Sequence, residues 1–566
     1  MRNRLLLSAA LVFTLSLGGF AGMEAQAADA STTSTDARDF GDYLSARLAA
    51  SQHDLPEAAK LYRASLKDDP NNPELLSHAF LYTAAEGDVG QAAKFAARMV
   101  QNEADNRGAR LALTVDALKH GDYAGARAQA AQSGKGPFTE LTLSLLDAWA
   151  AEGLGDTATA IKDLQQVQTE GGTEALSDYH RALVFDLTGQ NADADAAYRA
   201  AIAAGNTGPR IIDSYGRFLE RQGRAADARV FYTKLANDEA AGPIAAAGLT
   251  RLDHDTKPDR LIVSPQQGAA EALFGIAASL TDQTSADVAI LYLRFALYLS
   301  PDFDLAKIVL ADRFEALRKF DDAITVYRSV DADSPYGPAA AIQIAIDQMK
   351  LDRNDKAVDE LTAFVAKRSD DIAAWTSLGD AYRGQEKFAQ AADAYDHAVK
   401  LLGQVAPKDW PLFYARAVSE EQSHHWDAAE ADLQHALKLS PEQPQVLNYL
   451  GYTWVDQNRR LPEALAMLEK ARSLSPYDGY VVDSVGWAYY RLGRYPDAAK
   501  ALEAAVLLVP ADPTINDHLG DAYWRVGRKL EARFQWNHAL AFNPDADEKV
   551  VIEKKLAEGL PDSGHS

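Results

Sequence analysis

A step of 34 residues recurs near the C-terminus, and it constrains the fold more than any other feature of the chain. Residues 480–494 and 514–528 are identical at seven of 15 positions, with Gly486 and Gly520 in the same place. Other identities keep the same step: Tyr489 and Tyr523, Gly493 and Gly527, Ala498 and Ala532, Ala505 and Ala539, and Pro476, Pro510 and Pro544. A fixed period of this length predicts stacked supersecondary units, each completed by its neighbours.

Each unit is predicted to be a hairpin of two helices. The apolar face of the first helix recurs at i, i+3, i+4 and i+7, at Val482, Val485, Gly486 and Tyr489. Gly493 suits a left-handed C-terminal cap, and Pro496 suits the first turn of a second helix. That second helix carries the apolar stripe Ala498, Leu502 and Ala505. We expect the small residues Gly486 and Ala498 to let the two helices cross closely.

The pattern is also clear earlier in the chain, at Trp375, Leu378, Gly379, Tyr382, Ala391, Tyr395 and Ala398. In these residues it resembles the tetratricopeptide repeat (TPR). The resemblance implies an all-α solenoid, a right-handed superhelix of stacked antiparallel helix hairpins. It implies little about chemistry.

The chain is predicted to have six parts: a signal peptide (1–27), a disordered leader (28–38), a degenerate N-terminal repeat array (39–252), a break in register (253–269), a C-terminal array (270–545), and a capping helix with a tail (546–566). In the degenerate array, Gly87, Gly121 and Gly155 keep the 34-residue step and mark turns between helices. Ala464 follows Gly451 by one residue more than Ala498 follows Gly486, which predicts a bulged turn near 458–461.

The first residues resemble a secretory signal. Arg2 and Arg4 precede an apolar run from Leu5 to Phe20, and Ala25-Gln26-Ala27 is a small-residue cleavage site. A retained anchor is the alternative, but the run is short for a membrane span. With no Cys in the chain, neither a disulfide nor a lipid-modified Cys near the cleavage site is possible. We therefore expect a periplasmic protein that is not a lipoprotein and has no integral membrane segment after cleavage.

Composition and motifs argue against catalysis. The formal charge of −24 disfavours nucleic acid as a partner. His424 and His425 are neighbours and His435 lies ten residues on, which is poor spacing for a metal. No phosphate-binding loop or nucleophile elbow is present, and a thiol nucleophile is impossible. We expect no catalytic residue, no metal and no cofactor, and interpret the chain as a binding protein rather than an enzyme.

A candidate groove is formed by the first helices of the last hairpins. Positions three before, one after and four after the small Gly share one helix face. The predicted groove residues are Asn448, Tyr452, Asp483, Trp487, Tyr490, Asp517, Asp521 and Trp524. In TPR proteins this face lines the concave surface. Aromatics edged with carboxylates suit a protein or peptide segment that is apolar or basic. The alternative is that these aromatics pack between repeats.

Residues 270–545 also resemble TPR proteins of Gram-negative bacteria, some of them outer-membrane lipoproteins that act as adaptors for carboxyl-terminal processing proteases. This resemblance implies an exported scaffold or adaptor in cell-envelope protein quality control or protease recruitment. The missing lipoprotein Cys departs from that pattern. The alternative function is a structural component of an envelope assembly, such as polysaccharide export or cell-wall machinery.

Overall fold

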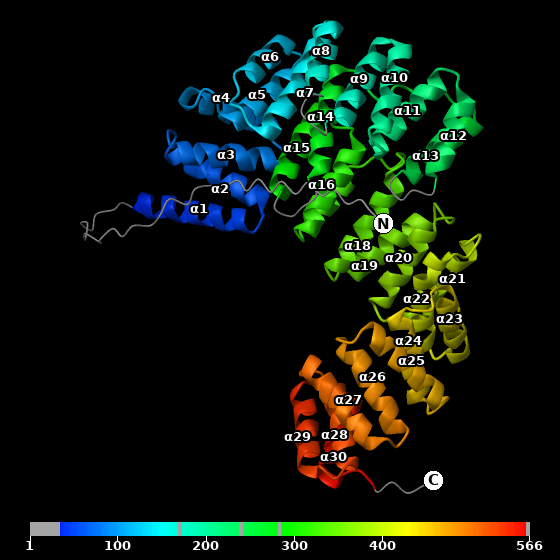
Figure 1. Ribbon diagram of the computed structural model, residues 1–566. Helices are drawn as coiled ribbons and strands as arrows, with labels where there is room; N and C mark the ends of the chain where they lie inside the picture. The colour runs from blue at the N-terminus through cyan, green and yellow to red at the C-terminus, as the bar shows by residue number, and fades with distance from the viewer. Residues whose placement is uncertain (1–33, 168–172, 237–240, 281–284, 562–566) are drawn as a thin grey trace. The chain divides into compact units, whose positions relative to one another are not determined.

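The computed structural model describes residues 34–167, 173–236, 241–280 and 285–561, so the predicted signal peptide lies outside the described residues. In these residues it contains α-helices, a short 3-10 helix (Pro407–Asp409) and no strand, which confirms the all-α prediction (Figure 1). The chain divides into two compact units, residues 1–150 and 151–566, and the division falls inside α7.

The first unit contains α1 (Ser34–Ser51), α2 (Leu55–Asp68), α3 (Pro73–Glu86), α4 (Val89–Asn102), α5 (Arg107–Lys119), α6 (Tyr123–Ala131) and most of α7 (Pro137–Gly153). The second begins with α8 (Thr157–Val167), α9 (Glu174–Thr188), α10 (Asn191–Ala203), α11 (Pro209–Arg221), α12 (Ala225–Leu235), α13 (Gly242–Asp253), α14 (Pro265–Ser279), α15 (Ala286–Leu299), α16 (Asp304–Ala316), α17 (Phe320–Tyr327), α18 (Gly337–Lys350) and α19 (Asn354–Val365). It ends with α20 (Ile372–Arg383), α21 (Phe388–Leu401), α22 (Trp410–Gln422), α23 (Trp426–Leu439), α24 (Pro444–Asp456), α25 (Leu461–Leu474), α26 (Gly479–Arg491), α27 (Tyr495–Leu508), α28 (Pro513–Arg525), α29 (Lys529–Ala541) and α30 (Ala546–Glu558).

The predicted hairpin is present, with caps of the expected kind. The side chain of Asp478 accepts hydrogen bonds from the first backbone N–H groups of α26, and Asp512 does the same for α28. Gly493 follows α26 with φ 73° and lets the chain turn into α27. Because the same devices recur in these last hairpins, their local structure is specified by short stretches of sequence.

Residues in the left-handed region mark the turn of nearly every hairpin. In the first part of the chain they keep the 34-residue step: His53, Gly87, Gly121, Gly155, Gly189 and Gly223. This confirms the three glycine turns predicted from the sequence. After the break in register the step resumes at Arg318, Asp352 and Glu386, and then at His424 and Asn458 and at Gly493 and Gly527. From Arg318 to Asn458 the left-handed turn residue is never a glycine.

The bulged turn is also confirmed. Between α24 and α25, both Asn458 (φ 56°) and Arg460 (φ 46°) are left-handed, whereas the turn between α26 and α27 has only Gly493. The additional residue is thus absorbed in the turn, and the packing faces of both helices are preserved.

The helices cross closely at the small glycines, as predicted. A Cβ built on Gly486 would lie 2.6 Å from Cγ of Leu502, and one on Gly520 would lie 2.4 Å from Cδ1 of Trp536. The side chain that fills the space opposite the glycine is therefore the large residue of the second helix, one turn beyond the small Ala498.

Within the predicted break in register, 253–269, only residues 254–264 lie outside helices. Helix α14 already begins at Pro265, because Ser264 caps it by accepting a hydrogen bond from the N–H of Gln267. At the other end, α30 occupies most of the range given to the terminal helix. Helix α1 begins at Ser34, inside the range predicted as a disordered leader.

Helix α14 packs mainly against α15, and it also contacts α9 and, through one buried ion pair, α11. The buried carboxylate of Glu271 pairs with Arg210 at the start of α11. Two further ion pairs involve α11: Arg221 pairs with Asp186 of α9, and Glu220 pairs with Arg251 of α13. The inner side of α11 is therefore covered by the chain itself and is not an open groove.

Candidate partner-binding surface

The eight predicted groove residues lie on three successive first helices, α24, α26 and α28, of the last hairpins (Figure 1). Tyr452, Trp487 and Trp524 are each half-buried, so part of every ring is open to solvent. The acidic residues Asp483 and Asp521 are instead buried. The structure thus brings the predicted residues to neighbouring helices but gives aromatic and acidic members different environments.

Asp483 is paired within the chain. Nδ1 of His518, on the next first helix α28, lies 3.0 Å from both carboxylate oxygens of Asp483. The imidazole is stacked on Trp487 with ring centroids 4.0 Å apart, and Trp487 is stacked on Tyr490 at 4.7 Å. Burial opposes a charged imidazole, but the Asp483 carboxylate outweighs it and the pKa of His518 is raised.

Asp517 and Asp521 share a cation from the last helix. Nζ of Lys555, in α30, lies 2.6 Å from Oδ2 of Asp517 and 2.9 Å from Oδ2 of Asp521. The other oxygen of Asp521 accepts a hydrogen bond from Nε1 of Trp536, the large residue opposite Gly520. Burial, reinforced by the nearby Asp517, raises the pKa of Asp521, although Lys555 acts in the opposite direction.

The remaining predicted residues have mixed surroundings. Trp524 contacts the backbone of Gly559, where a Cβ would lie 2.2 Å from its Cζ2, and Lys529 lies over its ring at 4.9 Å. Tyr452 is half-buried, and burial raises its pKa to about 12. Oδ1 of Asn448 is buried and makes no hydrogen bond within the described residues.

These contacts change the expected chemistry of the surface. The carboxylates proposed to hold a basic partner already hold His518 and Lys555 of the same chain. The reason is the repeat itself: a 34-residue step brings a residue of the next first helix beside the acidic face of the preceding one. The acidic residues thus take part in contacts between repeats, and so does Trp487, one of the aromatics for which packing between repeats was the alternative, through its stacking on His518.

One exposed aromatic on this face was missed. Tyr480, in the first turn of α26, is 57% exposed and lies three residues before Asp483 and seven before Trp487, on the same helix face. Its counterpart in α28 is Thr514, which donates a hydrogen bond to Glu548 of α30. The signal was available in the sequence as a tyrosine six residues before Gly486.

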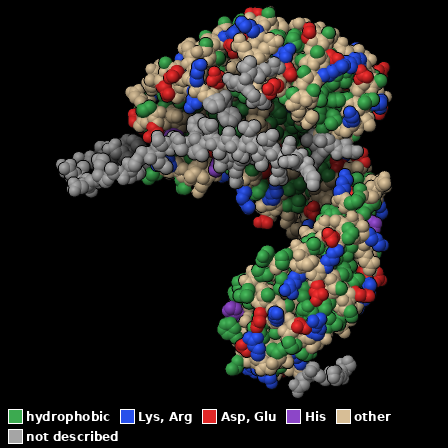
Figure 2. Space-filling view, in the orientation of Figure 1, with side chains coloured by type: hydrophobic (Ala, Val, Ile, Leu, Met, Phe, Trp, Pro, Cys, Tyr) green, Lys and Arg blue, Asp and Glu red, His purple; other side chains and the backbone are tan. Residues whose placement is uncertain are grey.

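The surface around these helices carries both signs of charge. Figure 2 shows acidic and basic side chains interspersed over the visible face. Many are paired across hairpins; for example, Arg528 bonds Glu503 at 2.7 Å, and Arg416 bonds Asp396 at 3.0 Å. The negative net charge is therefore spread over the visible face rather than gathered in one field.

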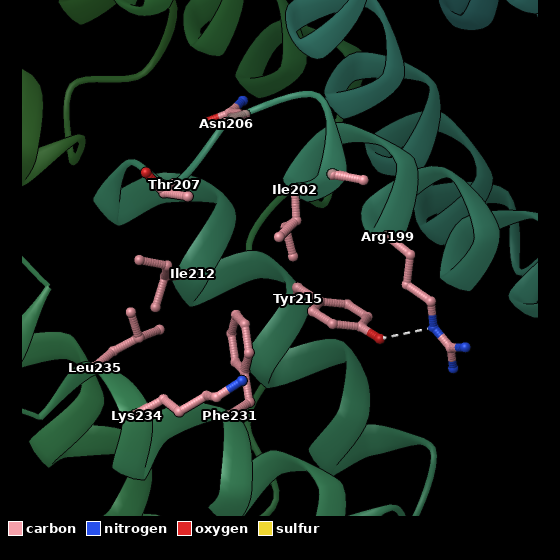
Figure 3. Close-up of a pocket in the computed structure, with 10 residues that line it drawn as sticks. Arg199, Ile202, Asn206, Thr207, Ile212, Tyr215, Phe231, Lys234 and Leu235 are labelled. Carbon is pink, nitrogen blue, oxygen red and sulfur yellow. Dashed lines mark hydrogen bonds between the residues drawn. The ribbon is translucent and has the colours of Figure 1, made fainter. Parts of the chain in front are cut away.

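A separate pocket of about 410 Å³ lies between α10, α11 and α12. Ile202, Ile212, Tyr215, Phe231 and Leu235 form much of its wall, together with Arg199 and Lys234 (Figure 3). The only hydrogen bond between the residues drawn in Figure 3 joins Arg199 Nε to the Tyr215 hydroxyl, at 3.3 Å. These lining residues contain no pair of carboxylates and no histidine, so the pocket offers no evident acid–base chemistry.

Metal and membrane features can be stated for the described residues only. In that part of the chain, no three His, Cys, Asp or Glu side chains are grouped so that they could hold a metal ion. His435, one of the three histidines considered above, packs on Phe413 at 4.4 Å. None of the helices within the described ranges combines the length and apolarity needed to cross a membrane.

Together, the hairpins, their glycine crossings and the first-helix face define a class of protein, the helical-hairpin solenoid. Sequence models of two descriptions match the second unit: "TPR repeat" over residues 486–527, and "Tetratricopeptide repeat" over residues 342–406 and 414–479. The chain therefore contains tetratricopeptide repeats over these residues.

The relatives cover only part of the chain. A TPR repeat-containing protein of Pseudomonas aeruginosa is 28% identical over 173 residues, which are 30% of this chain and 28% of that protein. The ER membrane protein complex subunit 2-A of Xenopus laevis is 31% identical over 80 residues, 14% of this chain and 27% of that protein. The chain thus spans less than a third of the length of either relative.

Solved structures with similar folds include the APC/C hetero-tetramer Cut9-Hcn1, with 15% identity and a TM-score of 0.39, and yeast Tom70, with 16% identity and a TM-score of 0.32. Each alignment covers 93% of this chain and 96% of the solved chain.

Proposed function

We propose that this protein is an exported, non-catalytic scaffold that binds a protein partner along the inner face of α24, α26 and α28. One observation carries the proposal: three successive first helices present partly exposed aromatic rings, at Tyr452, at Tyr480 and Trp487, and at Trp524. Large aromatics of this kind dominate the binding energy of protein interfaces.

The partner is a segment whose apolar side chains lie against these rings. Because His518 and Lys555 already pair with the carboxylates of α26 and α28, affinity along this face comes mainly from apolar and stacking contacts. In the envelope, such a scaffold would serve protein quality control or protease recruitment, which is the role of the adaptors that the C-terminal array resembles. A structural place in an envelope assembly is the second candidate.

The binding face is tested with two double variants of the full chain. Tyr480→Ala with Trp487→Ala removes two rings from the face, whereas Leu530→Ala with Phe534→Ala removes side chains that are 86% and 60% exposed on α29. Affinity capture from the periplasm should recover a partner with the wild-type chain and the α29 variant but lose it with the face variant. Equal capture by all three proteins would contradict the proposal.

The nature of the captured partner separates the two roles. A protease supports recruitment, and an export or cell-wall complex supports the structural role. Thermal unfolding of both variants shows whether a loss of capture reflects the face or the fold. Export is tested by mass spectrometry of the native protein, which should begin at Ala28 or within a few residues of it.

A further inference from the structure

Helix α30 supplies to α28 the chemistry that the sequence predicted for an external partner. A basic side chain, Lys555, lies between two carboxylates, Asp517 and Asp521, at 2.6 and 2.9 Å. Its side chain is only 13% exposed. The charge-assisted bonds are therefore largely shielded from water, and such bonds are stronger in a shielded position than in an exposed one.

The apolar side of α30 completes the contact. Ile552 is 1% exposed in the cluster that contains Leu519 and Tyr523, and Leu556 and Leu560 pack on the same cluster beside Trp524. Gly559 lies against the indole of Trp524 so closely that no side chain would fit there. An aromatic ring, a pair of carboxylates and a groove for apolar side chains are thus all occupied by one short segment.

This occupant is held from one side only. Ile552 is its single buried side chain, while Val550 and Val551 are 65% and 52% exposed. Its remaining hydrogen bonds lie near its ends: Thr514 bonds Glu548 at 3.2 Å, and Arg525 donates to the carbonyl of Pro561, just after the helix, at 2.7 Å. A segment with one buried anchor opens at a lower free energy than a hairpin helix packed on both sides.

Leaving the site beneath α30 empty would cost free energy. Asp517 and Asp521 lie one helical turn apart on α28, and Asp521 is 4% exposed. Without Lys555, two like charges would remain in a partly desolvated position, which is strongly unfavourable. Whatever replaces α30 must therefore bring a cation to the same place, together with apolar side chains for the groove.

We propose that α30 is a displaceable occupant of a binding site on α28, and that the site accepts an amphipathic helix of another protein with a lysine flanked by apolar residues. The spacing is given by Ile552 and Leu556 of α30 and Leu560 just after it, which pack on the same apolar cluster, and by Lys555, which pairs with α28. This inference rests on the proposed function and adds a site with a defined ligand chemistry to it.

The test uses a labelled peptide with the sequence of residues 546–561 and the full chain in three forms. Lys555→Glu weakens the hold of α30 by placing a carboxylate beside Asp517 and Asp521. Lys554→Glu is the matched control, because Lys554 is exposed and its substitution changes the charge by the same amount one residue away. The peptide should bind the Lys555→Glu chain at least tenfold more tightly than either the wild-type or the Lys554→Glu chain.

Two further measurements locate the peptide. A peptide carrying Ala in place of the lysine should bind at least tenfold more weakly, and adding Asp517→Asn with Asp521→Asn to the Lys555→Glu chain should remove the gain. Equal peptide affinity for all three forms, each verified as folded by circular dichroism, would overturn the proposal. So would wild-type dimers formed by exchange of α30, seen as concentration-dependent sedimentation.

The outcomes are separable from those of the proposed function. Capture through Tyr480 and Trp487 tests α26, where α30 is not the occupant. If capture depends on these rings but the peptide fails, only the displaceable site is lost. If the peptide binds but capture fails, the site on α28 remains and the proposed face on α26 is wrong.

Discussion

His518 is a single residue that joins two repeats through two kinds of contact. It pairs with Asp483 of the preceding first helix and stacks on Trp487 of the same helix. One imidazole thus connects α26 and α28 by both an ion pair and a ring contact. Since its charge depends on pH, the junction between these hairpins does too.

Acidification should tighten this junction. The pKa of His518 is raised in the fold, so its stabilisation is present below its usual pKa, about 6.5, and is lost as the pH rises through the folded value. The pKa of Asp521 is also raised, which gives the same sign. After correction for intrinsic rates, amide hydrogen exchange in residues 515–526 should slow between pH 8 and pH 5.5.

A variant and a second histidine provide the controls. His518→Gln should remove most of this pH dependence; an unchanged gain on acidification would show that another group is responsible. His180 should behave in the opposite way, because burial lowers its pKa to about 3. Its stabilisation is present above about pH 6.5 and is lost on acidification, so α9 should lose protection over the same range.

At the scale of the helix and its turn, the middle hairpins carry a strain that the last two hairpins avoid. Glu386 turns the chain from α20 to α21 with φ 58°, where α26 and α27 are joined by Gly493. A left-handed conformation costs an L-residue roughly 1–2 kcal/mol, and a glycine loses about half of that gain through its greater chain entropy.

Glu386→Gly should therefore stabilise the protein by about 0.5–1 kcal/mol. The reverse change, Gly493→Ala, should destabilise it by about 1 kcal/mol, because a Cβ there meets nothing within 4 Å and only the backbone conformation is penalised. Urea unfolding monitored by hydrogen exchange of the affected hairpins would measure both. If both changes shifted the free energy of unfolding in the same direction, turn strain would be excluded as the cause.

The contact between α11 and α14 depends on buried charge rather than on the repeat pattern. It rests on Glu271, whose side chain is 1% exposed, and on Arg210, which also lies 4.4 Å above the ring of Phe303. Breaking such a pair leaves an uncompensated charge in the interior, which is more damaging than removing both charges.

Glu271→Gln should cost about 3–5 kcal/mol, because Arg210 loses its buried partner. Arg210→Met together with Glu271→Leu should cost clearly less. Chemical denaturation of the single and double variants would test this order. A double variant that is as damaged as the sum of both single variants would mean that shape, rather than charge, holds α14 in place.

At the scale of the whole chain, stability is expected to be local, since the units of a solenoid interact mainly with their neighbours. Gly486→Leu inserts a side chain where even a Cβ would lie 2.6 Å from Leu502. The expected loss is at least about 1–3 kcal/mol. Hydrogen exchange should increase in α26 to α29 and remain unchanged in residues 174–221. Equal loosening of both segments would contradict a solenoid.

The sequence by itself determined the repeating hairpin and its punctuation. Caps such as Asp478, turns such as Gly493 and close crossings such as Gly486 act within a few residues or between adjacent helices, so their signals recur with the 34-residue step. The same locality made the bulged turn at Asn458 predictable from one additional residue.

Only the tertiary structure decided which partners the predicted groove residues have. The stripe of aromatics and acids was found on the correct helices, yet the sequence did not show that His518 and Lys555 would satisfy the acids. It also gave no sign that Glu271 would pair with Arg210, 61 residues away and outside the repeat step. The physical reason is that the packing angle between helices determines which side chains meet, and this angle is a property of the assembled stack.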